Sequence, residues 1–256
     1  MIDRQLQTLY QAASKHSQYQ VLPPAVLDLL PQDAVQVKSR FERERLDYIT
    51  SRLDLRGCRV ADIGGNTGYF SFELLERGAT AVSHIEGNTA HHRFVAHAAE
   101  RLGLADCLLS ENRYIDFEHP DLAPHDVVFL LNVLHHVGDD YGDPATQADS
   151  VQATMLAALR QLAPRTHHLV LQLGFNWQGD PKRPIFAHGS KAEVIDLVKQ
   201  LGDDYEVLAV GIASRGEDGR VVYRDLDAHN IARDDRLGEF LNRPLFILRS
   251  RRWPQH

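Results

Sequence analysis

Hydrophobic and polar positions follow a regular order along this chain. Short apolar runs, typical of buried strands, are separated by longer stretches whose apolar residues recur at helical spacing. Residues 126–131 form a continuous apolar run after one aspartate, which indicates a central parallel strand buried on both faces. Strands that alternate with helices predict an α/β fold with a doubly wound, mostly parallel, Rossmann-like sheet of seven strands.

A helical segment precedes the first strand. Residues 2–13 and 39–53 predict helices, so we expect an N-terminal helical extension over residues 1–50 and one domain over residues 51–256. Near the C-terminus, Asp218 and Gly219 lie between strand-like segments and predict a hairpin. Further strands are expected at 81–86, 106–109, 168–173, 205–210 and 245–249, and helices at 89–102, 144–162 and 190–201.

Composition narrows the class of protein. The chain has 256 residues, 43% of them hydrophobic, which suffices for one sizeable core. Its formal net charge of -7 disfavours nucleic acid as the main partner, because phosphate binding needs a basic surface. No apolar run approaches the ~20 residues that span a membrane, so we expect a cytoplasmic protein. No metal site is expected, because the histidines at 91, 92 and 97 lack a completing ligand set.

The strongest chemical signal lies in residues 59–70, where a short buried strand leads into a glycine-rich turn and the start of a helix. Gly64, Gly65 and Gly68 permit backbone angles and close approaches that a Cβ would forbid. A turn of this kind at a helix N-terminus is expected to leave free N–H groups that face a ligand. The ligand would lie at the C-terminal edge of a parallel sheet.

The spacing of the turn selects among ligands. A dinucleotide fingerprint starting at Gly64 needs glycine at 66 and glycine or alanine at 69, but the chain has Asn66 and Tyr69. A Walker loop needs Gly-Lys-Ser/Thr, which is absent from the turn. The remaining pattern, Asp62-x-Gly-x-x-x-Gly, resembles motif I of the class I S-adenosylmethionine (SAM) methyltransferases, with Asn66 at the middle glycine. The resemblance implies SAM as cofactor, with its ammonium attracted by Asp62.

A second acid fits the same cofactor. Glu86 ends the second predicted strand, where a carboxylate can accept hydrogen bonds from both ribose hydroxyls. The loop after the third strand covers the adenine in this family, through either Asn112 or Tyr114. By the resemblance, the cofactor-binding residues are Asp62, Gly64, Asn66, Gly68, Glu86, Gly87, Asn112 and Asn132.

The element Asn132-Val133-Leu134-His135-His136 follows the central strand. It resembles motif IV and the next loop of many small-molecule methyltransferases. Methyl transfer to a hydroxyl needs a proton removed, and histidine suits this at neutral pH. Either His135 or His136 is the candidate base, and the other is expected to be structural. Residues 174–180 are expected to expose Trp177 for recognition of a sugar or ring.

These features define the expected function. The His-His pair, the loop at 176–177 and the strand at 243–246 resemble methyltransferases of bacterial surface-polysaccharide (O-antigen) synthesis. That resemblance implies O-methylation of a hydroxyl on a sugar, glycan or small metabolite. Two alternatives remain open, namely a tRNA wobble-uridine-modifying transferase and a non-catalytic SAM-binding or scaffold protein. The sequence leaves the acceptor, the partners and the oligomeric state undetermined.

Overall fold

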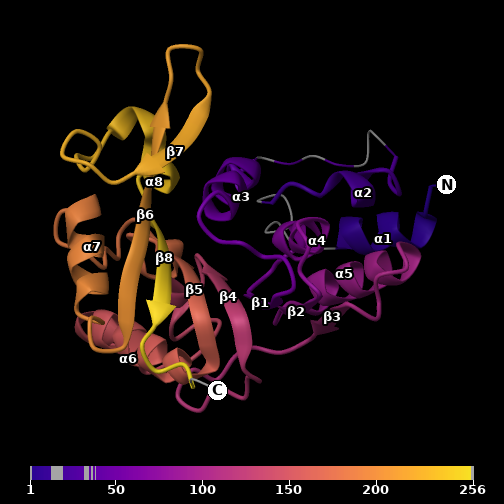
Figure 1. Cartoon of the computed structure of the whole chain (residues 1–256), viewed down its shortest axis with the longest axis horizontal. Helices are drawn as coiled ribbons and strands as arrows, with labels where there is room; N and C mark the ends of the chain where they lie inside the picture. The colour runs from indigo at the N-terminus through magenta and orange to yellow at the C-terminus, as the bar shows by residue number, and fades with distance from the viewer. Residues whose placement is uncertain (1, 13–19, 32–34, 36, 38, 255–256) are drawn as a thin grey trace. The chain divides into compact units, whose positions relative to one another are not determined.

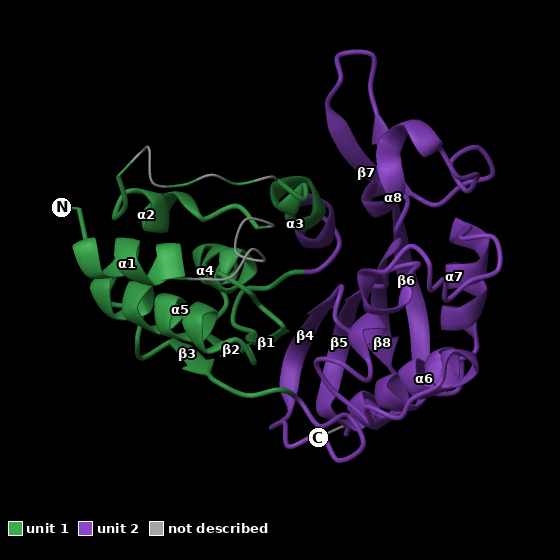
Figure 2. Ribbon diagram, turned by 180° about the vertical axis from the view of Figure 1, so that it is seen from behind, with its two compact units in different colours: residues 1–46, 54–114 green, residues 47–53, 115–256 purple. Residues whose placement is uncertain are grey.

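The computed structural model describes residues 2–12, 20–31, 35, 37 and 39–254. The chain forms two compact units, shown in green and purple in Figure 2. Unit 1 contains residues 1–46 and 54–114, and unit 2 contains residues 47–53 and 115–256. The expected domain boundary at residue 50 stays a prediction.

Unit 1 carries three parallel strands in the order β3-β2-β1. They are β1 (Arg59–Ile63), β2 (Ala81–Ile85) and β3 (Leu108–Glu111), connected through α4 (Tyr69–Glu76) and α5 (Thr89–Arg101). The parallel register pairs Ile63 with Ile85 and Ile85 with Glu111. The carboxyl ends of the three strands therefore meet at one edge, where the glycine turn and Glu86 begin.

Two helices before β1, α1 (Arg4–Ala12) and α2 (Pro24–Leu27), contribute to the core of unit 1. The next helix, α3 (Glu42–Thr50), belongs to unit 1 up to Leu46 and to unit 2 from Asp47. Figure 1 shows α1 alongside α5, where Leu6 and Tyr10 pack against Phe94. Asp3 fixes the start of α1, because its carboxylate accepts from the Leu6 amide at 2.9 Å and from Arg101 at 2.8 Å. Residue 13 of the expected first helix lies outside the described residues.

Unit 2 carries five strands in the order β4-β5-β8-β6-β7. They are β4 (His125–Leu131), β5 (Thr166–Gln172), β6 (Tyr205–Arg215), β7 (Val221–Asp225) and β8 (Leu245–Ser250), with helices α6 (Val151–Leu162), α7 (Lys191–Lys199) and α8 (Gly238–Leu241). Only β4 and β5 pair in parallel, and the other three pairings are antiparallel. Five 3₁₀ turns complete the connections: η2 (Leu134–His136), η3 (Ala148–Ser150), η4 (Ala163–Arg165), η5 (Trp177–Gly179) and η6 (Asp235–Leu237).

The α/β class is confirmed, and the expected count of seven strands is wrong. The described chain has eight strands, because β6 runs to Arg215 and its hairpin partner β7 is a strand in its own right. The bounds of other elements also differ, as two examples show. The third strand lies at 108–111, and the helix expected over 144–162 starts at Val151. The start is late because Asp143 accepts hydrogen bonds from the Ala145 and Thr146 amides and holds a turn there.

None of the helices in the described part of the chain has the length and apolar character needed to cross a membrane.

Candidate functional site

The glycine turn of unit 1 needs its glycines for separate reasons. Gly64 and Gly68 have φ of 69° and 83°, and a Cβ on Gly68 would lie 2.9 Å from Val95. A Cβ on Gly65 would lie 2.4 Å from the His84 ring. Asn66 is also left-handed, with φ of 53°, a conformation that asparagine tolerates.

Four successive amides of this turn, at positions 66 to 69, are bonded inside the protein, which corrects the expectation that they are free to face a ligand. The Asn66 amide donates to Glu86 Oε2 at 2.8 Å, and the Thr67 amide donates to Asn66 Oδ1 at 2.7 Å. The next two amides donate to the Gly65 carbonyl and to a side chain of the N-terminal segment. A phosphate would have to displace these acceptors, so the geometry disfavours a nucleotide held by its phosphates.

Glu86 links the two turns that follow β1 and β2. One carboxylate oxygen accepts from the Asn66 amide, and the other accepts from the Asn88 amide at 2.7 Å. Each oxygen of a carboxylate can accept more than one hydrogen bond, because the group offers about four lone-pair positions. Glu86 is therefore a preorganised acceptor next to the glycine turn.

Asn112 and Tyr114 lie against the turn that contains Gly87. The Asn112 amide group donates to the Glu86 and Gly87 carbonyls, each at 3.0 Å, and its oxygen accepts from Thr89. The Asn112 side chain thus holds the backbone at residues 86 and 87 through hydrogen bonds. The Tyr114 ring is 56% exposed and so close to Gly87 that a Cβ there would lie 2.2 Å from it. The structure therefore brings Glu86, Gly87, Asn112 and Tyr114 together.

Asp62 and His84 are two buried titratable groups under the turn. Burial raises the pKa of Asp62 to about 6. Hydrogen bonds from Ser71 oppose this rise, one from its backbone amide and one from its hydroxyl at 2.7 Å. Burial also lowers the pKa of His84 to about 4. His84 Nε2 lies 3.1 Å from the Asn66 carbonyl, which can only accept, so Nε2 carries the proton of a neutral ring. A neutral histidine thus forms a hydrogen bond with the backbone of Asn66, which has a left-handed conformation.

In unit 2, Asn132 occupies a constrained position after β4. Its φ is 63°, and its amide donates to the Gln172 carbonyl at 2.8 Å. Its side chain donates to Gln172 Oε1 and accepts from Arg243 at 2.7 Å. Arg243 is itself paired with Glu239 through two hydrogen bonds. A residue that several hydrogen bonds hold in a left-handed conformation is typical of a functional site at the end of a strand.

The two candidate bases occupy different environments. His135 is buried, and its Nδ1 accepts from the Gly174 amide at 3.2 Å. Burial and the Arg243 charge hold its pKa well below the usual range, so the ring stays neutral. The His136 side chain is 26% exposed, and its Nδ1 lies 3.6 Å from Asp140. Of the pair, His136 is the ring that solvent reaches and that a carboxylate faces.

The loop after β5 differs from its expected role. Trp177 is buried, its indole N–H donates to the Val137 carbonyl at 2.7 Å, and Arg183 lies 3.6 Å over its ring. The expectation of an exposed Trp177 is therefore wrong, because the indole fixes the loop that follows His136.

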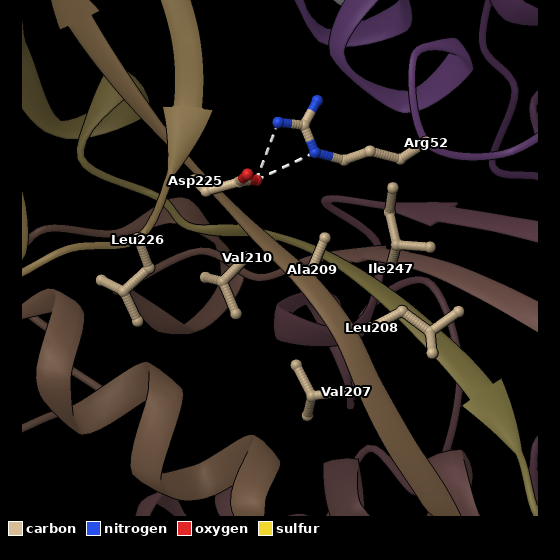
Figure 3. Close-up of a pocket in the computed structure, with 8 residues that line it drawn as sticks. All are labelled: Arg52, Val207, Leu208, Ala209, Val210, Asp225, Leu226 and Ile247. Atoms are coloured by element: carbon tan, nitrogen blue, oxygen red, sulfur yellow. Dashed lines mark hydrogen bonds and ion pairs between the residues drawn. The ribbon is translucent and has the colours of Figure 1, made fainter.

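A pocket of about 510 Å³ lies elsewhere in unit 2 and is lined by residues of β6, β7 and β8 together with Arg52 (Figure 3). Its walls are aliphatic, and its polar groups are Arg52 and Asp225, which form an ion pair at 2.8 Å. The lining contains none of the predicted site residues. Among the described residues no cluster of three or more His, Cys, Asp or Glu side chains could hold a metal ion.

Several residues of these clusters were missed from the sequence. His84 could have been noticed, because it is the polar exception on a buried face of its strand. The contacts of Arg243 with Asn132 and of Gln20 with Thr67 have no local signal, since the partners are 111 and 47 positions apart.

Comparison with known proteins agrees with the motif. No model of a known family matches the chain. A ubiquinone biosynthesis O-methyltransferase of Neisseria meningitidis serogroup C (strain 053442) is 34% identical over 105 residues, which are 37% of this chain and 40% of that protein. The bifunctional kinase-methyltransferase WbdD superposes with a TM-score of 0.63 at 18% identity over 95% of this chain and 46% of the WbdD chain. A second WbdD structure gives a TM-score of 0.62 at 19% identity.

The fold is therefore one shared with a methyltransferase structure. The chain is similar to methyltransferases, the class of protein that the glycine motif predicts, and the O-methyltransferase relative agrees with SAM as the cofactor. The chain spans less than half the length of either relative.

Proposed function

We propose that this chain is a SAM-dependent methyltransferase that methylates a hydroxyl of a sugar, glycan or small metabolite. The observation that carries the proposal is the closed glycine turn with Glu86 at its centre. The turn amides already have acceptors, and the acceptor of the Asn66 amide is Glu86, a carboxylate of which each oxygen can accept more than one hydrogen bond. Such a site suits a ligand that presents hydroxyls and an ammonium, and SAM supplies both together with a methyl group on a sulfonium.

The residues of unit 1 take roles that follow from their contacts. Glu86 accepts from the ribose hydroxyls, and Asp62 attracts the ammonium. Tyr114 is the better candidate to cover the adenine, because its ring is exposed while the Asn112 side chain is engaged by backbone and Thr89. Asn112 then acts by fixing Gly87, over which the ring lies.

The residues of unit 2 fit the removal of a proton from the acceptor. We assign His136 as the general base and Asp140 as the carboxylate that orients it and stabilises the imidazolium. His135 is a poor base, since burial and Arg243 oppose its protonation. It positions the neighbouring backbone through the Gly174 amide. Asn132, at the end of β4, stays a predicted cofactor-binding residue.

An oxygen acceptor is supported by two observations. One relative is by name an O-methyltransferase. The strand end carries Asn132-Val133-Leu134-His135 in place of the Asn-Pro-Pro-Tyr motif of nucleic-acid N-methyltransferases. The glycan acceptor rests on the resemblance to polysaccharide methyltransferases.

Calorimetric titration with SAM, S-adenosylhomocysteine (SAH) and NAD tests the cofactor. Binding of the first two without NAD is expected, and tight NAD binding would refute the assignment. Transfer of labelled methyl from SAM to bacterial glycans and phenolic metabolites then tests the acceptor. His136→Asn should abolish transfer and leave SAH affinity unchanged, while His135→Asn should chiefly lower the melting temperature. Equal transfer by wild type and His136→Asn would remove His136 as the base.

A further inference from the structure

The N-terminal segment places one buried amide side chain at the glycine turn of unit 1. Gln20 is only 9% exposed, although it belongs to a segment that precedes β1 by almost 40 residues. Leu22, two positions later, is 3% exposed and lies in the core cluster with α1, α2 and α5. The Gln20 side chain is therefore anchored by its neighbours in the chain.

Both contacts of Gln20 are made to the turn. Its Oε1 accepts from the Thr67 hydroxyl at 3.1 Å and from the Tyr69 amide at 3.1 Å. Thr67 is fully buried, and Tyr69 is the first residue of α4. One oxygen thus binds the turn on both sides of Gly68.

The turn needs this oxygen because it cannot supply its own. The residue before a helix normally caps the first turn through a side-chain oxygen. Here that residue is Gly68, which has no side chain, and its φ of 83° and the nearby Val95 methyl exclude a larger residue. Gln20 supplies a substitute cap from 49 positions away, because its oxygen accepts from the amide of Tyr69, the first residue of the helix.

We infer that Gln20 is a positioning residue of the cofactor site, so that cofactor affinity depends on the N-terminal segment. The inference rests on the proposed function, because the turn is taken as the SAM-binding element. Gln20 fixes Thr67 and Tyr69, and Asn66 between Gly65 and Thr67 is the residue whose amide binds Glu86. Loss of the Gln20 oxygen frees the turn to adopt conformations in which Glu86 loses that contact.

The test is calorimetric titration of SAH into the full chain and its Gln20 variants. Gln20→Ala should weaken SAH by about 2- to 30-fold, the range expected for a lost helix cap. Gln20→Glu should stay within about twofold of wild type, since a carboxylate still accepts both hydrogen bonds and is favoured at a helix N-terminus. Gln5→Ala, an exposed glutamine of α1, should bind as wild type.

A second variant separates positioning from loss of stability. Leu22→Ala loosens the same segment without removing the cap, so it should lower the melting temperature and weaken SAH less than Gln20→Ala does. In the ligand-free protein, Gln20→Ala should speed hydrogen exchange of the Tyr69 amide, and Gln20→Glu should restore its protection.

The outcomes distinguish the two proposals. If wild type binds neither SAM nor SAH, the cofactor assignment fails and the inference fails with it. If wild type binds SAH and Gln20→Ala binds equally well, or Leu22→Ala weakens SAH as much as Gln20→Ala, only the role of Gln20 is overturned.

Discussion

The affinity for the cofactor should depend on the protonation of Asp62. This carboxyl is 3% exposed, and burial raises its pKa to about 6, with hydrogen bonds from Ser71 and the Arg45 charge opposing that rise. An ammonium beside it favours the ionised form, so binding releases a proton wherever Asp62 is still protonated. Affinity for SAH should therefore rise as the pH rises through about 6.

The magnitude follows from the titration. A group with a pKa of 6 is about one-tenth ionised at pH 5 and about nine-tenths ionised at pH 7. If only the ionised form attracts the ammonium, the dissociation constant changes about tenfold between these pH values, or about 1.4 kcal/mol. The α-ammonium and carboxylate of SAH keep their charges over this range, so the change reports on the protein.

Calorimetry of SAH binding between pH 5 and pH 7.5, in two buffers of different ionisation enthalpy, measures both the affinity and the proton release. Asp62→Asn keeps the acceptor for Ser71 and removes the titration, so its affinity should be low and nearly independent of pH. Asp106→Asn, an exposed acid of the same unit, should keep the wild-type profile. A profile for Asp62→Asn that matches wild type would refute the assignment of Asp62.

Three further predictions concern the same turn. Glu86→Gln should weaken SAH by about 1.5–3 kcal/mol in calorimetry, as for a lost charged hydrogen bond, with Glu100→Gln as exposed control. Gly65→Ala should lower the melting temperature because the added Cβ would meet the His84 ring, and combining it with His84→Ala should recover part of that loss. If the double variant loses as much stability as the sum of the two single variants, the contact is contradicted. The His84 pKa is depressed in the fold, so its contribution to stability is present above pH 6.5 and is lost as the pH falls towards about 4. Urea unfolding should show this loss in wild type and much less in His84→Gln, and equal pH profiles would contradict it.

Much of unit 1 follows from local sequence patterns. Gly64 and Gly68 are needed where the sequence places them, because their φ values are positive. Glu86 lies directly after β2 and meets the turn, as its strand-end position predicts. These relations could be predicted because parallel strands in register place their ends at one edge.

The remaining features depend on contacts between distant positions. The turn amides are closed by Glu86 and Gln20, 20 and 49 positions away. Asn132 is fixed by Gln172 and Arg243, 40 and 111 positions away. The periodicity of apolar residues indicates which face of a helix or strand is buried. It does not indicate which polar side chain of another element will form a hydrogen bond with it. The choice between His135 and His136 also depends on the tertiary structure, because the two adjacent histidines differ in their burial.

The closed turn also bears on which ligands the edge of unit 1 can select. A dinucleotide site binds pyrophosphate with backbone N–H groups at a helix N-terminus. Here the amides of Asn66, Thr67 and Tyr69 donate to side chains of the protein, so releasing them for a phosphate would leave Glu86 and Gln20 without those hydrogen bonds. What the edge offers instead is the Glu86 carboxylate, with the Asp62 carboxyl buried beneath the turn. An anion would meet like charge without donors to offset it, whereas hydroxyls and an ammonium complete the set. Because the amide donors of the turn are already hydrogen-bonded within the protein, the arrangement favours SAM over NAD.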